Sequence, residues 1–436
     1  MTIKSVFNTG LKIAVEDTYS VAPAAGDYYQ GGRWVDIVTD GLPDLMDRQA
    51  VIFPAGHAGR RAMNNRAPVV GRKWSDGSFN FPVTADFLGT VIYGLMGSAS
   101  AQSTPSTTFD LVNDFGVGGG TSQVIDFTNQ PSDGGAIIRV WVSGTSTAGS
   151  ITFQGIDAHG NGASETLSWT SGGSLHTRTS FSSLEASGTT VYSGNDASLT
   201  LQGFKYFTYH FSLNNTSAPT LSIERYGDPT AGATSISRMH TGMVVQNFTL
   251  NTPAAQRDGL VTGSVQLEGN PTATCTAGTL SETSAVGVWP SWGLKITRDN
   301  ANWYKVTDAT LNVSTGARNY RSAAGVQNPQ GVFHGGFEAT GGFQILVDDE
   351  GEFLRWQGAS KQAIRYLWTS PWKLTTNDYQ TLSASMLSAY IEGDVSPQED
   401  EQAWSLSMNI RAANNDSAGV ISWDLKSNVP PSAYGL

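Results

Sequence analysis

The residues that could perform catalysis or bind metal are few in this chain and lie far apart. Its single cysteine is Cys275, and its histidines are His57, His159, His176, His210, His240 and His334. No two histidines follow a His-x-His or His-Glu-x-x-His spacing, so the ligand count that zinc requires is missing and we interpret them as ordinary surface or half-buried residues. One cysteine allows neither an internal disulfide nor a multi-cysteine metal site, and we interpret Cys275 as a small half-buried residue.

Two acidic runs, Asp348-Asp-Glu-Gly-Glu352 and Glu399-Asp-Glu401, could supply calcium ligands or a glycosidase carboxylate pair. Neither has the spacing of a calcium loop, and we interpret both as solvated surface. Asp157-Ala-His-Gly-Asn161 favours a hairpin tip with Asx-turn bonding over a metal site. We find no nucleophile elbow, Walker loop or dinucleotide fingerprint. The sequence therefore predicts no catalytic residue, no cofactor-binding residue and no metal ligand.

The composition predicts a β-rich protein that does not hold DNA. In 436 residues, 39% are hydrophobic, only 14% are charged, and glycine is abundant, which is typical of strands and turns. The net charge of −11 disfavours non-specific nucleic-acid binding, which needs a cationic surface. The first ten residues lack an apolar core and no long apolar run follows, so we expect no signal peptide, no membrane span and synthesis in a cytoplasm.

The N-terminal part predicts a sheet with one helix packed on it. Leu11–Val15 is a short strand, and a loop-rich stretch from Ala22 to Arg66 follows. Ser78–Val83 alternates apolar and polar residues with period two, as a strand does. Ala85–Met96 has apolar residues at helical spacing and is followed by Gly97, a C-terminal stop.

The middle of the chain predicts a separate β-sandwich between two linkers. Residues 98–120 are rich in Gly, Ser and Thr, which is linker composition, and Asn214–Pro219 is a second small linker. Turn clusters at intervals of 8–15 residues then separate short runs with strand character. The predicted strands are Gln123–Phe127, Ala136–Val142, Ser150–Gly155, Glu165–Trp169, Thr189–Tyr192 and Ser198–Leu201.

The C-terminal part predicts further strands and a second helix. We expect a long strand over Val332–Val347, kinked at Gly341, a strand over Phe353–Trp356 and a short helix over Ser360–Trp368. Other strands are predicted at Leu294–Thr297, Tyr304–Val313, Thr381–Ile391, Ala403–Ala412 and Val420–Leu425.

One phrase occurs twice and suggests an internal duplication. Val245–Asn251 (VQNFTLN) and Val306–Asn312 (VTDATLN) share four of seven residues. Glycines at the same offsets follow each phrase, at Gly259, Gly263 and Gly269 and again at Gly331, Gly335 and Gly341. Duplication without a visible catalytic site favours assembly over chemistry.

The chain resembles the tail tube (major tail) proteins of long-tailed bacteriophages. The segments that carry this resemblance are Gly77-Ser-Phe-Asn-Phe-Pro-Val-Thr-Ala-Asp-Phe-Leu-Gly-Thr-Val-Ile-Tyr-Gly-Leu-Met-Gly97, Leu221-Ser-Ile-Glu-Arg-Tyr-Gly227 and Gly242-Met-Val-Val-Gln-Asn-Phe-Thr-Leu250, with a similar style from Trp292 to Phe343. Residues 152–162 and 180–184 resemble the immunoglobulin-like decoration domains of phage virions.

The resemblance implies a mainly β fold with two tail-tube-type domains and an inserted Ig-like β-sandwich. Each tube domain would have antiparallel sheets packed roughly orthogonally and one flanking helix. Residues 1–100 and 205–272 would form the first tube domain, 121–203 the Ig-like insert and 275–436 the second tube domain. Sheets would join edge to edge into rings, and rings would stack into a tube.

The function implied is that of a structural subunit of the virion tail tube, assembled in the host cytoplasm, with a central channel for the viral DNA. The partners implied are other copies of the chain, the tape measure protein and tail terminator or tip proteins, with no cofactor, no membrane and no specific DNA binding. A ring would contain three chains with pseudo-six-fold symmetry, or six chains. We expect acidic residues of the long strands to face the channel, within a Debye length of roughly 8 Å of the DNA.

Three segments are candidates for contacts between rings: the arm 1–10, the loop 40–75 and the loop 314–331. Four tryptophans could anchor interfaces, although core packing explains any one of them as well: Trp289, Trp292, Trp303 and Trp372. Two other classes stay open. One is a carbohydrate-binding adhesin or tail-associated receptor-binding protein, and the other is a glycoside hydrolase that uses carboxylates among Asp348, Asp349, Glu352 and Glu392.

Overall fold

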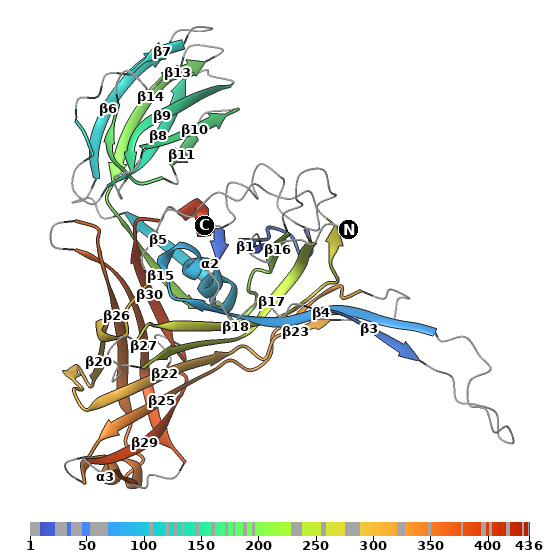
Figure 1. Ribbon diagram of the computed structural model, residues 1–436, viewed down its shortest axis with the longest axis vertical. Coiled ribbons are helices and arrows are strands. Elements are labelled where there is room, and N and C mark those ends of the chain that lie inside the picture. The colour runs from blue at the N-terminus through green and yellow to red at the C-terminus, as the bar shows by residue number, and fades with distance from the viewer. Residues whose placement is uncertain are drawn as a thin grey trace, which may run out of the picture.

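A computed structural model describes most of the chain (Figure 1). The described residues are 9–21, 33–35, 46–52, 69–103, 108–117, 122–125, 127, 129–131, 135–144, 148–157, 162–170, 173–177, 179–185, 190–193, 197–227, 238–253, 259–274, 288–320, 328–347, 350–375, 378–393, 398–400, 403–415, 419–429, 431–434 and 436.

The fold is mainly β, as the sequence predicts, and it has a body and a projecting sandwich. The strands of the body are β1 (Thr9–Val15), β2 (Arg33–Val35), β3 (Met46–Ile52), β4 (Val69–Pro82), β5 (Gly97–Ser103), β15 (Phe207–Leu213), β16 (Leu221–Gly227), β17 (Arg238–Thr252), β18 (Thr262–Gly269), β19 (Ala273–Thr274), β20 (Leu294–Arg298), β21 (Ala301–Asn302), β22 (Val306–Ser314), β23 (Arg318–Tyr320), β24 (Gly331–Phe333), β25 (Glu338–Leu346), β26 (Gln362–Lys373), β27 (Tyr379–Glu392), β28 (Gln398–Asp400), β29 (Ala403–Ala412) and β30 (Ser422–Ser427). Its helices are α2 (Ala85–Met96), α3 (Gly351–Gln357) and the 3₁₀ turns η3 (Ser291–Gly293) and η4 (Pro431–Tyr434).

One antiparallel main sheet runs across the body in the order β3-β4-β18-β17-β22-β25-β29, and β29 continues to β28 and to the end of β27. Period-two alternation gives each strand a buried apolar face toward the core. One buried residue from each of the six strands after β3 illustrates this face: Phe79, Val265, Phe248, Leu311, Phe343 and Met408. The hairpin β3–β4 extends beyond the rest of the sheet (Figure 1).

A second layer of strands packs behind the main sheet in two parts. One part has the order β2-β1-β16-β17 and uses the first residues of β17. The other has the order β21-β20-β26-β27-β30-β15-β5 and uses the first residues of β27. The strands β17 and β27 therefore each belong to both layers, and one continuous hydrophobic core lies between the layers.

The body contains the same order of elements and the same pairings twice. In the first copy, which we call repeat 1, the elements are β1, β2, β3, β4, α2, β16, β17 and β18; in repeat 2 they are β20, β21, β22, β25, α3, β26, β27 and β29. In both copies the first strand pairs with the second and with the sixth element: β1 with β2 and β16, and β20 with β21 and β26. The third strand pairs with the fourth, as β3–β4 and as β22–β25. The last strand pairs with the seventh and with the fourth element: β18 with β17 and β4, and β29 with β27 and β25. The duplication suggested by the sequence is thus visible in the topology.

The repeated phrase in the sequence, however, does not mark equivalent strands. Its two copies lie in β17 and β22, which pair with each other antiparallel, with Leu250 opposite Leu311. Topology instead makes β17 the equivalent of β27, and β22 the equivalent of β3. The predicted glycine correspondence is also wrong in register, because Leu250 faces Gly263 whereas Leu311 faces Gly341, not Gly335.

Helix α2 has the bounds that the sequence predicts and is buried along almost its whole length. Gly97 ends it in a left-handed conformation (φ 79°), and its N–H donates to the carbonyl oxygen of Tyr93. The helix packs against β17 and β1 of its own repeat and against β5, β15, β30 and η4. Tyr434 of η4 donates from its hydroxyl to the carbonyl oxygen of Ala85, and its ring lies over Gly89. The C-terminal turn therefore holds repeat 1 to the end of the chain.

Several predicted elements are wrong. The described part of 98–120 is not a linker, because residues 98–103 belong to β5 and residues 108–117 form the first strand of the sandwich. Phe353–Trp356 belongs to helix α3, and Ser360–Trp368 is largely strand β26, where Ile364, Tyr366 and Trp368 are buried with period two. The long strand predicted over Val332–Val347 is two strands, separated at 334–337. The segment 40–75 contains β3 and the start of β4, and its remaining residues, 40–45 and 53–68, lie outside the described part.

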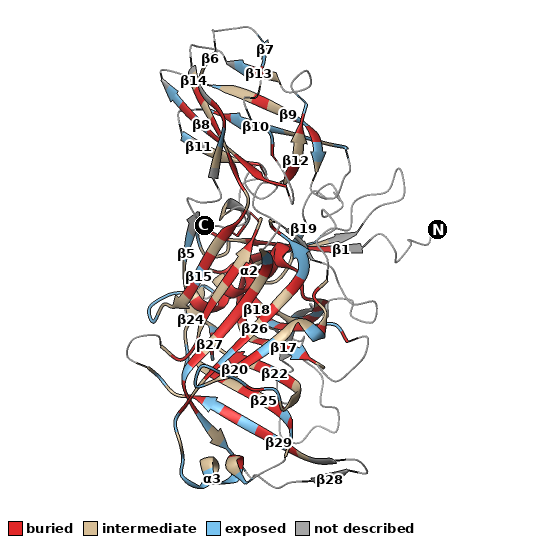
Figure 2. Cartoon of the chain, turned by 90° about the vertical axis from the view of Figure 1, so that its left-hand side faces the viewer, coloured by how far each residue is buried: buried red, intermediate tan, exposed pale blue. Residues whose placement is uncertain are grey.

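The inserted sandwich has its own core and projects from one end of the body (Figures 1 and 2). One sheet has the order β11-β8-β14-β6, and the other has β10-β9-β13-β7 with β12 beside β9. Its strands are β6 (Thr108–Val117), β7 (Ser122–Val124), β8 (Ile137–Gly144), β9 (Gly149–Asp157), β10 (Gly162–Trp169), β11 (Gly173–His176), β12 (Phe181–Leu184), β13 (Thr190–Ser193) and β14 (Ala197–Phe204). The chain leaves and re-enters the body at the paired strands β5 and β15. Its immunoglobulin-like character and the predicted domain bounds stay predictions.

The junction between sandwich and body is an aromatic cluster around His176. Its ring centroid lies 6.2 Å from that of Phe204 and 6.0 Å from that of Phe207, and these two phenylalanines stack at 5.5 Å. The guanidinium of Arg139 lies 5.7 Å from the centre of the Phe204 ring. Burial, and secondarily the charge of Arg139, lowers the pKa of His176 from 6.5 to about 4.

The stability of this junction is expected to fall as the pH drops from about 6.5 to about 4. In that window the unfolded chain protonates His176 and the folded chain does not, so the proton favours unfolding, by at most about 3 kcal/mol. Thermal unfolding of the wild type and of a His176→Gln variant across this pH range tests it. The variant lacks the titrating ring and should lose stability less steeply; parallel pH profiles would contradict the expectation.

Candidate functional site

The main sheet carries a continuous polar face on the side opposite its buried residues. The outward residues of β4, β18, β17, β22, β25 and β29 are half-buried or exposed, and almost all have hydroxyl, amide or carboxylate groups. They are Asp76, Ser78, Asn80, Thr262, Ser264, Gln266, Glu268, Asn247, Thr249, Asn251, Asp308, Thr310, Asn312, Ser314, Glu338, Thr340, Gln344, Ser405, Ser407, Asn409 and Arg411. We call this set the polar face.

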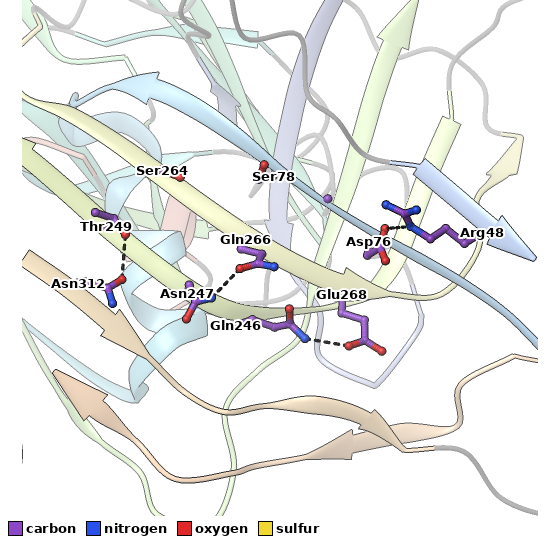
Figure 3. A pocket seen from close by; sticks show the side chains of 11 residues that line it. Arg48, Asp76, Ser78, Gln246, Asn247, Thr249, Ser264, Gln266, Glu268 and Asn312 are labelled. Carbon is purple, nitrogen blue, oxygen red and sulfur yellow. Dashed lines mark hydrogen bonds and ion pairs between the residues drawn. The ribbon is translucent and has the colours of Figure 1, made fainter. Parts of the chain in front are cut away.

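Hydrogen bonds between neighbouring strands hold the side chains of the polar face in place (Figure 3). Asn247 donates to Gln266 at 2.6 Å, and Thr249 donates to Asn312 at 2.9 Å. Gln246, at a bulge in β17, donates to Glu268 at 2.8 Å. Because donors and acceptors satisfy one another along the sheet, this surface is already ordered before any partner approaches.

The polar face carries more negative than positive charge, and its arginines are bound by carboxylates. Among the residues named above the one cation is Arg411, whose Nε donates to Glu338 at 2.7 Å and whose Nη1 donates to Glu392 at 3.1 Å. Arg72, further along β4, is exposed on the same side. The hydrogen bond and charge of Glu338 raise the pKa of Arg411. Arg48 of β3, at the edge of this face, is ion-paired with Asp76. Partial burial raises the pKa of Asp308.

A pocket of ≈ 610 Å³ opens on the polar face between β3 and β22 (Figure 3). Its lining is polar: Arg48, Asp76, Gly77, Ser78, Gln246, Asn247, Thr249, Ser264, Gln266, Glu268 and Asn312. Asp76 and Glu268 are directly opposite in the ladder, and each accepts a hydrogen bond that offsets their repulsion: Trp74 donates to Asp76 at 3.0 Å, and Gln246 to Glu268.

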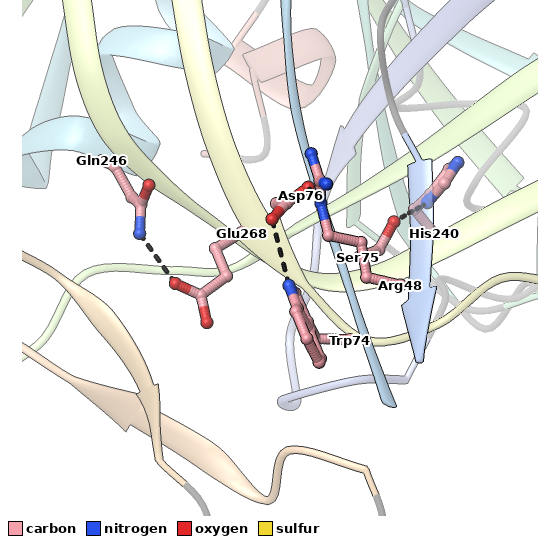
Figure 4. A network of polar contacts seen from close by, with 7 residues as sticks. All are labelled: Arg48, Trp74, Ser75, Asp76, His240, Gln246 and Glu268. Carbon is pink, nitrogen blue, oxygen red and sulfur yellow. Dashed lines mark hydrogen bonds and ion pairs between the residues drawn. The ribbon is translucent and has the colours of Figure 1, made fainter. Parts of the chain in front are cut away.

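A serine–histidine pair lies close to this pocket but is closed to substrates (Figure 4). Ser75 Oγ and His240 Nδ1 are 2.8 Å apart, the spacing of a nucleophile and its base. Both residues are fully or almost fully buried, with exposed fractions of 0% and 1%. The pair therefore joins β4 to β17 as a buried hydrogen bond.

A comparison with known protein families shows to which family this chain belongs. A family model described as phage tail tube protein matches residues 7–412, which includes both repeats and the insert. The chain belongs to the phage tail tube protein family. No curated protein matches it.

Membership makes this tail tube protein a structural component of the virion tail that assembles with copies of itself. Fold and family agree with the resemblance read from the sequence. The family is a structural one, and the carboxylates weighed for glycoside hydrolysis have structural partners: Glu352 is ion-paired with Arg298, and Glu392 with Arg411. Asp348 and Asp349 lie outside the described residues.

Of the four candidate tryptophans of the tail tube protein, two are buried and two are exposed. Trp289 and Trp303 are buried in the core, whereas Trp292 and Trp372 are exposed by 70% and 40%. Cys275, His57 and His159 lie outside the described part, as do residues 1–8 of the predicted arm and residues 158–161 of the predicted hairpin tip.

Among the described residues there is no group of three or more metal-ligating side chains. No helix in the described part is long and apolar enough to cross a membrane. The polar face itself was missed as a set of residues, although its signal, period-two alternation of Asn, Gln, Ser and Thr with apolar residues, is readable in the sequence.

Proposed function

We propose that three copies of this tail tube protein close into a ring whose lumen is lined by the polar face, and that stacked rings form the channel for the viral DNA. The observation that carries the proposal is the duplicated topology. Each repeat supplies four strands to the main sheet, β3, β4, β18 and β17 or β22, β25, β29 and β27, in the same spatial order. Equivalent strands run in the same direction, as rotation about a ring axis requires.

The ends of the main sheet support closure into a ring. In the described part, β3 pairs only with β4, and β28 only with β29, so both present unpaired backbone groups. Exposed edges of this kind pair readily with another strand. Within the chain, β17 of repeat 1 pairs with β22 of repeat 2, and the same kind of junction between copies would join β27 and β28 to β3 of the next chain.

The chemistry of the polar face suits a channel for a polyanion. DNA is held by free lysines and arginines that displace its counterions. Arg411 and Arg48 are instead bound by carboxylates. The other charged residues of the polar face are Asp76, Glu268, Asp308 and Glu338, and Arg72 lies beyond them on the extended part of β4. A surface of ordered amides and hydroxyls offers DNA few attractive contacts that would slow its passage.

The candidates for contacts between rings remain the arm 1–10, the loop 40–75 and the loop 314–331, and the two loops include connections at equivalent places in the repeats. Residues 53–68 connect β3 to β4 in the sequence, and residues 315–337 connect the equivalent strands β22 and β25. Hairpins that point the same way from each repeat would meet the neighbouring ring at regular intervals. The tape measure protein, the tail terminator or tip proteins and assembly in the host cytoplasm remain part of this proposal.

Native mass spectrometry and electron microscopy of the purified full chain test the proposal together. We expect rings with the mass of three chains and with a central channel, and stacks of such rings at high concentration. Rings of six chains would contradict the stoichiometry. Monomers that persist at high concentration would contradict the ring itself.

A further inference from the structure

The two equivalent helices of the repeats differ sharply in how they are covered. In α2, every residue except Tyr93 is buried (Figure 2). In α3, Phe353 is 44% exposed and Leu354 is 58% exposed. Clustered apolar side chains on the surface of a soluble domain mark an interaction site.

The exposure of these side chains follows from how α3 is fixed. Glu352 on the inner side of the helix is buried and ion-paired with Arg298 of β20. Arg298 in turn lies 4.3 Å from the centre of the Trp303 ring. Arg355 reaches Asp299 at 3.4 Å. With these contacts holding the helix in one rotation, Phe353 and Leu354 point outward.

The chain itself shows what covers a helix in this position. Helix α2 packs against β17 of its own repeat, and α3 packs against β27, the equivalent strand. The additional cover of α2 comes from β5, β15, β30 and η4. Three of these, β30, β15 and β5, are consecutive strands of the second layer, and β30 joins them to β27 of repeat 2. The sheet that continues from repeat 2 therefore covers the helix of repeat 1. Helix α3 has no third repeat in its own chain to cover it.

We propose that α3 docks on repeat 1 of the next copy of this chain, at the side of its second layer where β19 pairs with β17. β19 is the counterpart of β30, because each pairs with the strand of its repeat that belongs to both layers. β19 pairs with β17, and β30 pairs with β27. The contact would repeat between chains the packing of α2 on repeat 2 within the chain. It is a head-to-tail contact, as closure of a ring requires. This inference rests on the ring proposed above.

A charge placed on α3 tests the docking. In the full chain, Leu354→Asp is expected to reduce the assembled fraction at least tenfold in sedimentation velocity, while circular dichroism and the melting temperature of the monomer stay unchanged. The matched control is Ile156→Asp, a similarly exposed apolar residue on β9 of the sandwich, which should assemble like the wild type. Hydrogen exchange of the wild type adds an independent readout, and residues 351–357 should become protected on assembly.

The outcomes separate this inference from the ring itself. If wild-type rings form and Leu354→Asp assembles equally well, or exchange at 351–357 is the same in monomer and ring, the docking of α3 is wrong and the ring stands. If the wild type forms no ring, the proposed function fails first. A variant that does not fold is replaced by Leu354→Ala, which should weaken assembly in the same direction.

Discussion

Replacing Gly89 by leucine is expected to lower the free energy of unfolding by about 3 kcal/mol, at the upper end of the usual cost of overpacking. A Cβ atom at Gly89 would lie 2.6 Å from the ring of Tyr434, which is fully buried. The ring has little room to move, because it also packs edge-on against Tyr209, with 4.9 Å between centroids. The gain in helix propensity over glycine is at most about 1 kcal/mol and does not offset the clash. Chemical or thermal denaturation of the full chain measures the change.

A double-mutant cycle distinguishes the clash from a general effect on the helix. Tyr434→Ala removes the ring and should itself cost about 3–5 kcal/mol as a cavity. Together, the two substitutions should cost at least about 1 kcal/mol less than their sum, because the leucine then fills the space of the ring. Gly162→Ala, where an added Cβ meets no atom within 4 Å, is the neutral control. Additive costs would show that Gly89 and Tyr434 do not share one space.

The sequence predicts well those elements whose pattern has a single interpretation. Helix α2 has apolar residues at helical spacing and a glycine stop, and its predicted bounds agree with the structure. In β26, by contrast, Ile364, Leu367 and Trp368 fit a helix, whereas Ile364, Tyr366 and Trp368 fit a strand. Only the neighbours β20 and β27, distant in sequence, decide in favour of the strand.

Low sequence complexity hides strands that long-range pairing creates. Residues of β5 are Gly, Ser, Ala and Gln, with no strong strand former among them, and read as a linker. They become a strand because β15, more than a hundred residues later, pairs with them from Gly97 to Ser103.

The candidate site shows the same division between local and long-range information. That Asn247, Thr249 and Asn251 share one face follows from alternation alone. That they lie opposite Ser314, Asn312 and Thr310 depends on the register of β17 with β22, a strand that is distant in the sequence. The repeated phrase was misleading for this reason: similar strands can be neighbours as well as equivalents.

Lysines on the polar face are expected to slow DNA ejection from the virion more than tenfold at low salt. The triple variant Asn247→Lys, Gln266→Lys and Asn312→Lys places three cations on adjacent strands, so a ring of three chains would gain about nine charges toward the DNA. Each added contact with phosphate displaces counterions, and stacked rings repeat the effect along the channel. The retardation should weaken steeply as salt is raised.

A matched set of lysines on the sandwich separates the channel from total charge. Gln154→Lys, Ser164→Lys and Ser168→Lys add the same charge at exposed positions of β9 and β10 and should leave the ejection rate unchanged. Electron microscopy first confirms that both variants carry normal tails, and the single variant Gln266→Lys serves if the triple variant does not assemble. Equal ejection rates for the two sets would place the polar face outside the channel. A salt-dependent delay confined to the first set would require that the DNA pass along this face, because screened charges act only within roughly 8 Å at physiological salt.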